Sequence, residues 1–131
     1  MGCDIHLYLE KKNNQGVWEH YPIPLEDLPD NRNYQVFALL AGVRGRVKKT
    51  YFARRGIPED TSYRDPLLNE SLVEDDIPYL GEHSFTFASI KELKKVKWDE
   101  AEFSDQWPLF LEKHFPDSEN DDVRMLIGFD S

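Results

Sequence analysis

An aspartate and a histidine stand two residues apart at the start of the chain, in the sequence MGCDIHLYLE. Residues 3–10 alternate between apolar and polar types, which is typical of a β-strand, so Asp4 and His6 project from one face. A carboxylate beside an imidazole can act as a general base or bind a divalent metal ion. A metal needs at least a third protein ligand, which His83 or Asp130 supplies if the fold brings them near. The alternative is that these polar side chains simply face solvent.

Arginines in the middle of the chain are candidates for recognising an anion. Arg55 precedes Gly56 in the stretch RRGIPED, and Arg44 follows an apolar segment. A guanidinium beside a glycine, where backbone can approach closely, suits a phosphate or a carboxylate. The sequence contains no glycine-rich phosphate loop, so no nucleotide-binding fold follows. The alternative is that these arginines hold their loop to nearby carboxylates.

Charge is unevenly distributed along the chain, whose formal net charge is −9. Residues 31–58 contain seven Lys and Arg residues and no acidic residue, so this segment carries +7 and the remainder of the chain −16. The net charge argues against general nucleic-acid binding by the whole surface. The basic segment indicates either a local anion site or a surface that pairs with acidic stretches such as residues 70–76.

Two nucleophilic mechanisms do not fit the pattern. Ser84 and His83 are adjacent on an extended segment and point to opposite faces, which argues against a catalytic triad with Asp4. Cys3 falls on the apolar face of the first strand, where a thiol stays protonated and unreactive. As the single cysteine it forms no internal disulfide, which suits a reducing cytosol. No run approaches the roughly 20 apolar residues of a membrane-spanning helix, so we expect no membrane partner.

Hydrophobic periodicity and turn residues predict a single α+β domain over residues 1–131. Two stretches, 3–10 and 17–21, form a hairpin, and 123–130 forms a strand of the same sheet. A short extended piece is expected at 85–88, and helices are expected at 34–43, 89–96 and 108–115. The stretch 56–82 has no sustained period, which is typical of a functional loop. We therefore expect a small, mainly antiparallel sheet with helices packed mainly on one side.

The chain resembles a family of small proteins encoded by phages and prophages. The resemblance rests on MGCDIH at the start, RNYQVFALLAGVR at 32–44, RGIPEDTS at 55–62, the HS pair at 83–84 and VRMLIGFD at the end. It implies the cytoplasm of an infected or lysogenic bacterium and brings no assigned activity. It also favours a role for Asp4, His6, Arg55 and His83, which lie within these blocks. Phenylalanines stand where the family's histidine segment is followed by a tryptophan, which weakens any aromatic-stacking role at that point.

These observations predict a pocket for a small anionic, phosphate-bearing ligand, lined by Asp4, His6, Arg44, Arg55 and His83. A divalent metal is a further option, with the candidate ligands Asp4, His6, His83 and Asp130. Whether the chain is an enzyme stays open, because the sequence specifies neither a nucleophile nor a complete metal set. The alternative is an acidic protein that binds and inhibits a host macromolecule through its surface.

Overall fold

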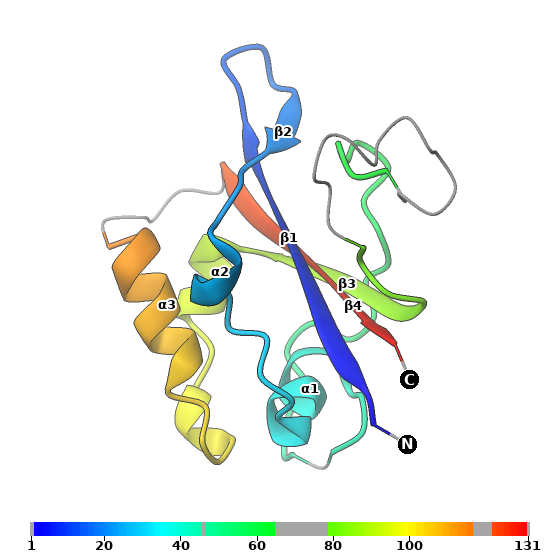
Figure 1. The fold of residues 1–131 in the computed structure, drawn as a ribbon, viewed down its shortest axis with the longest axis vertical. Coiled ribbons are helices and arrows are strands. Elements are labelled where there is room, and N and C mark those ends of the chain that lie inside the picture. The colour runs from blue at the N-terminus through cyan, green and yellow to red at the C-terminus, as the bar shows by residue number, and fades with distance from the viewer. Residues whose placement is uncertain (1, 46, 65–78, 117–121, 131) are drawn as a thin grey trace.

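A four-stranded antiparallel sheet forms the centre of the structure (Figure 1). The structure is a computed structural model that describes residues 2–45, 47–64, 79–116 and 122–130. The strands, in the spatial order β2-β1-β4-β3, are β1 (Asp4–Lys12), β2 (Trp18–His20), β4 (Val123–Asp130) and β3 (His83–Ser89). The predicted hairpin and the predicted C-terminal strand are confirmed.

β1 and β4 pair antiparallel over most of their length, from Asp4 opposite Asp130 to Lys11 opposite Val123. The two ends of the described chain therefore lie side by side (Figure 1). The hairpin between β1 and β2 turns on Asn13, whose side-chain oxygen accepts hydrogen bonds from the amides of Gln15 and Val17. This is the Asx-type turn that an asparagine favours before a glycine.

Helices cover one face of the sheet (Figure 1). The described helices are α1 (Tyr34–Ala41), α2 (Ile90–Lys94) and α3 (Gln106–His114), with short 3₁₀ turns η1 (Leu25–Asp27) and η3 (Trp98–Glu100). A capping box starts α2, because the Ser89 hydroxyl accepts from the Glu92 amide and the Glu92 carboxylate accepts from the Ser89 amide. No helix in the described ranges is long and apolar enough to cross a membrane.

The helix boundaries differ from the predicted ones. α1 ends at Ala41 instead of residue 43, because Gly42 adopts a left-handed conformation and caps it. α2 ends at Lys94, two residues before the predicted end. α3 begins two residues before Pro108, since the Trp107 amide already donates to the Ser104 carbonyl and its indole is buried.

The main core lies between the sheet and the helices, where Cys3, Ile5, Leu7 and Leu9 of β1 are buried. For the opposite face, the sequence left open whether its polar side chains face solvent or form a site. Tyr8 of β1 is also buried there, in a second apolar cluster with Tyr63, Leu80 and Leu126. Tyr63 and Leu80 belong to segments without helix or strand, so loops pack over this face of the sheet. Both faces of the sheet are therefore occupied, one by helices and one by loops.

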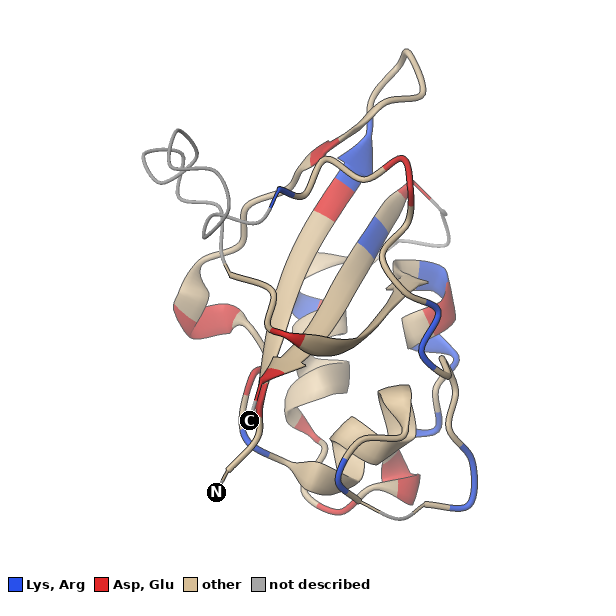
Figure 2. Ribbon diagram, turned by 90° about the vertical axis from the view of Figure 1, so that its right-hand side faces the viewer, with Lys and Arg blue, Asp and Glu red and all other residues tan. Residues whose placement is uncertain are grey.

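Most of the predicted functional loop at 56–82 lies in residues 65–78, outside the described residues, as does the acidic stretch 70–76. Pairing of the basic segment with that stretch is thus not described. Lys and Arg residues nevertheless lie beside Asp and Glu residues in several parts of the ribbon (Figure 2).

Candidate functional site

His6 and Asp130 form a hydrogen-bonded pair at the end of the sheet. The register of β1 and β4 places Asp4 opposite Asp130 and His6 opposite Gly128, so the polar side chains share the face away from the helices. Nε2 of His6 lies 2.8 Å from Oδ2 of Asp130, and the two side chains are 26% and 29% exposed. Nδ1 of His6 has no hydrogen-bond partner among the described residues. The imidazole is thus oriented by a carboxylate while one nitrogen stays available.

The segment that follows residue 78 closes over this pair. The ring of Tyr79 meets the His6 ring edge-on, with 5.3 Å between centroids. Gly128 permits the close approach, because a Cβ there would lie 1.9 Å from the carbonyl oxygen of Leu80. Gly81 adopts a φ of +101°, and a Cβ there would meet the backbone of Phe129 at 2.7–2.9 Å. Two glycines therefore let this segment lie directly on the end of β4.

Asp4 faces the same end of the sheet but is paired with Arg32, not with His6. Nε and Nη2 of Arg32 both donate to Oδ1 of Asp4, at 3.0 and 2.8 Å. These bonds raise the pKa of the Arg32 guanidinium above its ordinary value. Both side chains are about half exposed, at 51% and 53%. Asp4, which the sequence analysis placed beside His6, therefore orients Arg32 instead.

Arg44 lies near the same end, with its guanidinium 5.9 Å from the ring centroid of Tyr34. The Tyr34 hydroxyl accepts a hydrogen bond from the Cys3 amide, which ties this arginine to the start of β1. Burial raises the pKa of the Cys3 thiol, and the positive charge of Arg44 offsets this effect only in part. The thiol is fully buried, in agreement with the prediction that it is unreactive.

His83 lies at this end of the sheet but belongs to the other face. It is opposite Phe129, whose ring lies 6.4 Å away between centroids. Phe129 in turn packs on Phe37 of α1, at 5.2 Å. Directly paired residues project to the same side of a sheet, so His83 lies on the helix side and His6 on the loop side. Nδ1 of His83 is 2.8 Å from the Ser84 hydroxyl, so the prediction that these two side chains point to opposite faces is wrong. Regular alternation is broken here, because Ser84 has a φ of +58° and the register shifts between His83 and Thr86.

Arg55 lies beside the second half of β3, where its amide donates to the Thr86 hydroxyl at 3.1 Å. Its Nη1 and Nη2 donate to the two carboxylate oxygens of Glu92 at 2.9 and 2.7 Å, and Nη1 also donates to the Phe87 carbonyl. Arg55 and the neighbouring hydrogen bonds hold the pKa of the Glu92 carboxyl below its ordinary value. The geometry matches the alternative given above, in which this arginine holds its loop to a carboxylate.

The five candidate ligand-binding residues therefore do not meet in one pocket. Asp4, His6 and Arg44 lie at one end of the sheet, whereas His83 projects to the helix side and Arg55 lies beside the second half of β3. Of the four candidate metal ligands, His6 and Asp130 are in contact. Within the described ranges, no group of three or more His, Cys, Asp and Glu side chains is placed to hold a metal ion.

A buried polar network on the loop side was missed by the sequence analysis. Glu10 is fully buried and accepts hydrogen bonds from the Ser62 amide at 2.6 Å and from Nε of Arg124 at 2.7 Å. Nη2 of Arg124 donates to Asp60 at 2.9 Å, which lowers the pKa of that carboxyl. The alternation of residues put Glu10 on the same face of the strand as Asp4 and His6 but indicated no partner for it. The signal that could have corrected this was an arginine inside the otherwise apolar strand VRMLIGF.

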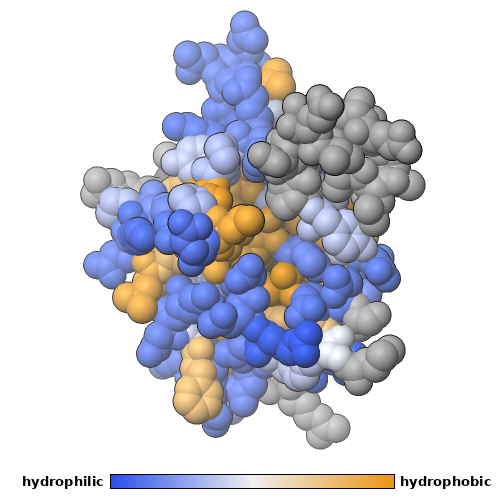
Figure 3. Space-filling model, in the orientation of Figure 1, coloured by the Kyte–Doolittle hydropathy of each residue, from blue (hydrophilic) through white to orange (hydrophobic). Residues whose placement is uncertain are grey.

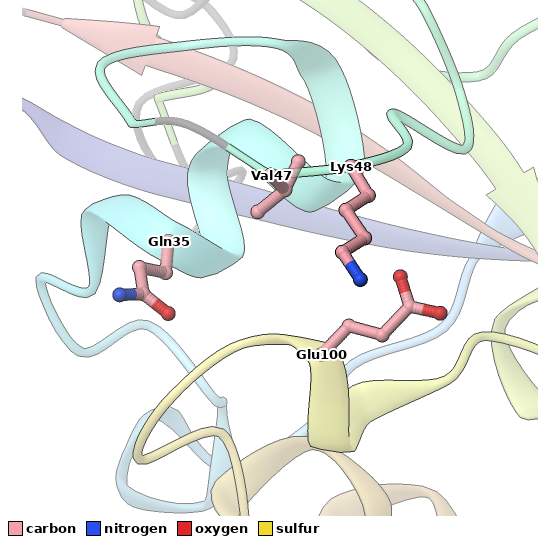
Figure 4. Close-up of a pocket in the computed structure, with 4 residues that line it drawn as sticks. All are labelled: Gln35, Val47, Lys48 and Glu100. Carbon is pink, nitrogen blue, oxygen red and sulfur yellow. The ribbon is translucent and has the colours of Figure 1, made fainter.

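A pocket of about 560 Å³ lies elsewhere, against α1 and η3 (Figure 4). Gln35, Val47, Lys48 and Glu100 line it. Lys48 and Glu100 point toward each other across it (Figure 4), but the described structure has no ion pair between them. Another groove, of about 400 Å³, includes Arg32 among its lining residues and so borders the end of the sheet that carries His6.

Protein-family models, curated proteins and solved structures show no match to this chain. The resemblance to phage proteins therefore stays a prediction.

Proposed function

We propose that the protein binds a small anionic, phosphate-bearing ligand at the end of the sheet where β1 begins and β4 ends. The observation that carries this proposal is the partly exposed His6–Asp130 pair, with a distance of 2.8 Å between Nε2 and Oδ2. Arg32 and Arg44 supply positive charge at the same end. Compared with the pocket expected from the sequence, this site keeps Asp4, His6 and Arg44 and omits His83 and Arg55.

The pair with Asp130 suits His6 for either of two tasks. A carboxylate that accepts from Nε2 fixes the ring orientation and the tautomer, so that the free Nδ1 of neutral His6 is an acceptor. When His6 is protonated, Nδ1 becomes a donor whose positive charge Asp130 stabilises. The first state can take a proton from a ligand, and the second can bind an anion.

Arg32 has N–H groups that its two hydrogen bonds to Asp4 do not use. A guanidinium carries five N–H donors, and the two bonds to Asp4 use Nε and one hydrogen of Nη2. The groove of about 400 Å³ has Arg32 among its lining residues, together with the acidic Glu102. Bidentate binding of a phosphate by such a half-exposed guanidinium is common.

Charge at the site depends on the protonation state of His6. Two carboxylates, those of Asp4 and Asp130, balance the guanidiniums of Arg32 and Arg44 when His6 is neutral. Protonation of His6 leaves one excess positive charge, which favours an anion. The test therefore compares binding at about pH 6 and at about pH 8.

The experiment measures melting temperature with inorganic phosphate, pyrophosphate and ATP, each with and without Mg²⁺, at both pH values. The His6→Asn and Arg32→Ala variants should lose any increase in melting temperature. The matched control is His114→Asn, because His114 forms a similar pair with Asp27, at 3.2 Å, on α3. The proposal fails if no anion shifts the melt at either pH, or if His6→Asn responds as the unmodified protein does. Metal assistance requires a larger shift with Mg²⁺ present.

The alternative, an acidic surface that inhibits a host macromolecule, is supported by the charge distribution alone. Apolar areas on the face shown in Figure 3 are separated by hydrophilic surface.

A further inference from the structure

The pocket of about 560 Å³ that lies against α1 and η3 carries opposite charges on its two sides. Lys48 and Glu100 point toward each other across it (Figure 4). Val47 and Gln35 complete its lining. Ligand sites in proteins commonly have volumes of about 300–1,000 Å³. The pocket is therefore large enough to hold a small molecule between the two charges.

Neither charged group is paired within the part of the chain that the structure describes. The Lys48 ammonium and the Glu100 carboxylate form no hydrogen bond or ion pair with any described residue. Nζ of Lys48 thus lies farther from the Glu100 oxygens than the 4.0 Å within which such groups pair. Both side chains are exposed, so a ligand has access to both. Glu100 repels a simple anion and Lys48 a simple cation, so the two charges favour a ligand that carries both signs.

Hydrogen bonds hold the two sides of the pocket at this spacing. The Tyr51 hydroxyl accepts from the Lys97 amide, the residue before η3, at 3.3 Å. On the other side of η3, the Glu102 amide donates to Oε1 of Gln35 on α1 at 2.7 Å. Tyr51 is itself fixed to α1, because its amide donates to the Leu39 carbonyl at 2.8 Å. The backbones that carry the two charges are therefore placed before a ligand binds.

We infer that this pocket binds a free α-amino acid with an aliphatic side chain. The ligand's carboxylate pairs with the Lys48 ammonium, and its own ammonium pairs with the Glu100 carboxylate. Both charges of an α-amino acid are attached to one carbon atom, so the ligand bridges a gap that the two protein side chains leave open. Its side chain contacts Val47, which is half-buried and packs against the main core. A ligand with a single charge would leave one of the two protein charges unmatched.

The test titrates L-leucine into the full chain and follows the amide resonances of Val47, Lys48 and Glu100 by NMR. We expect a saturable shift with a Kd of about 1 mM or below. L-Leucinamide lacks the carboxylate, and N-acetyl-L-leucine lacks the ammonium. Each should bind at least about threefold more weakly than leucine, because each loses one exposed ion pair.

Two variants match the two charges of the ligand. Lys48→Met removes the partner of the carboxylate, so it should weaken leucine at least about threefold and leave leucinamide unchanged. Glu100→Gln removes the partner of the ammonium, so it should weaken leucine by a similar factor and leave N-acetyl-leucine unchanged. Lys49→Met and Asp99→Asn are the matched controls, because both positions are exposed neighbours that do not line the pocket. Both controls should bind leucine as the unmodified protein does.

Three results would overturn the inference. The first is the absence of a saturable shift with leucine. The second is binding of leucinamide or N-acetyl-leucine as tight as that of leucine, which would show recognition of one charge only. The third is unchanged leucine binding by Lys48→Met or Glu100→Gln with the amide spectrum of the folded protein. Failure of the proposed anion site would leave these outcomes distinct, because neither His6 nor Asp130 lines this pocket.

Discussion

Arg124 donates from Nε to Oε2 of Glu10 at 2.7 Å, directly across the paired strands β1 and β4. The Glu10 side chain is fully buried and that of Arg124 is 9% exposed. Hydroxyl groups of Thr61 and Ser62 also donate to this carboxylate. The pair therefore holds the segment around residues 60–62 against the loop side of the sheet.

Removing the charge of Glu10 should destabilise the fold strongly. Glu10→Gln leaves the buried guanidinium of Arg124 without its inner carboxylate, which typically costs about 3–5 kcal/mol of unfolding free energy. Urea unfolding measures the change, and Glu112→Gln, at an exposed position of α3, is the control. The double variant Glu10→Gln/Arg124→Met should regain part of the loss, because it removes the unpaired charge. An effect as small as that of the control would contradict this account.

The His6–Asp130 pair should contribute modestly to stability. Both side chains are partly exposed, so we expect a coupling free energy of about 0.5–1 kcal/mol. A double-mutant cycle with His6→Asn and Asp130→Asn measures it near neutral pH. The same cycle on His114 and Asp27 provides the comparison, since that pair is also partly buried. A coupling of zero would mean that Asp130 does not hold the imidazole in solution.

Gly128→Ala should destabilise the protein, although this exchange in a strand normally stabilises by about 0.5–1 kcal/mol. The sign reverses here because the new Cβ would lie 1.9 Å from the Leu80 carbonyl oxygen. Relief of such overpacking commonly costs about 1–3 kcal/mol. Thermal unfolding gives the sign directly, and the Tyr79 contact with His6 should be disturbed as well. An unchanged or higher melting temperature would show that the Leu80 carbonyl does not lie so close to Gly128 of β4.

The Arg55–Glu92 pair should make stability depend on acid pH. Arg55 and hydrogen bonds hold the pKa of the Glu92 carboxyl below its ordinary value of 4.5. Because the folded-state pKa is the lower one, the stabilisation is present above about pH 4.5 and is lost as the pH falls through the folded-state pKa.

Glu92→Gln tests this dependence, since glutamine still serves in a capping box but has no charge. Melting temperatures of the variant should fall less steeply below about pH 4.5 than those of the unmodified protein. Glu112→Gln should follow the unmodified profile. Identical profiles for Glu92→Gln and the unmodified protein would exclude a contribution from this pair.

The sequence by itself determined where most strands and helices lie and which side of β1 faces the core. Alternation placed Cys3, Ile5, Leu7 and Leu9 on one side of β1, and these residues form the core. Ser89 marked the start of one helix, and Asp30, Asn31 or Asn33 that of another, which Asn33 caps in the structure. Such features depend on neighbours a few residues apart, so they can be derived from local spacing.

The tertiary structure alone decided which polar groups meet. Asp4 was the natural partner for His6 by spacing, yet His6 is bonded to Asp130, 124 positions away. Glu10 and Arg124 likewise pair across 114 positions. The register of β1 with β4 sets both pairs, and a shift of one residue would move every side chain of a strand to the other face. No pattern within a single strand specifies that register.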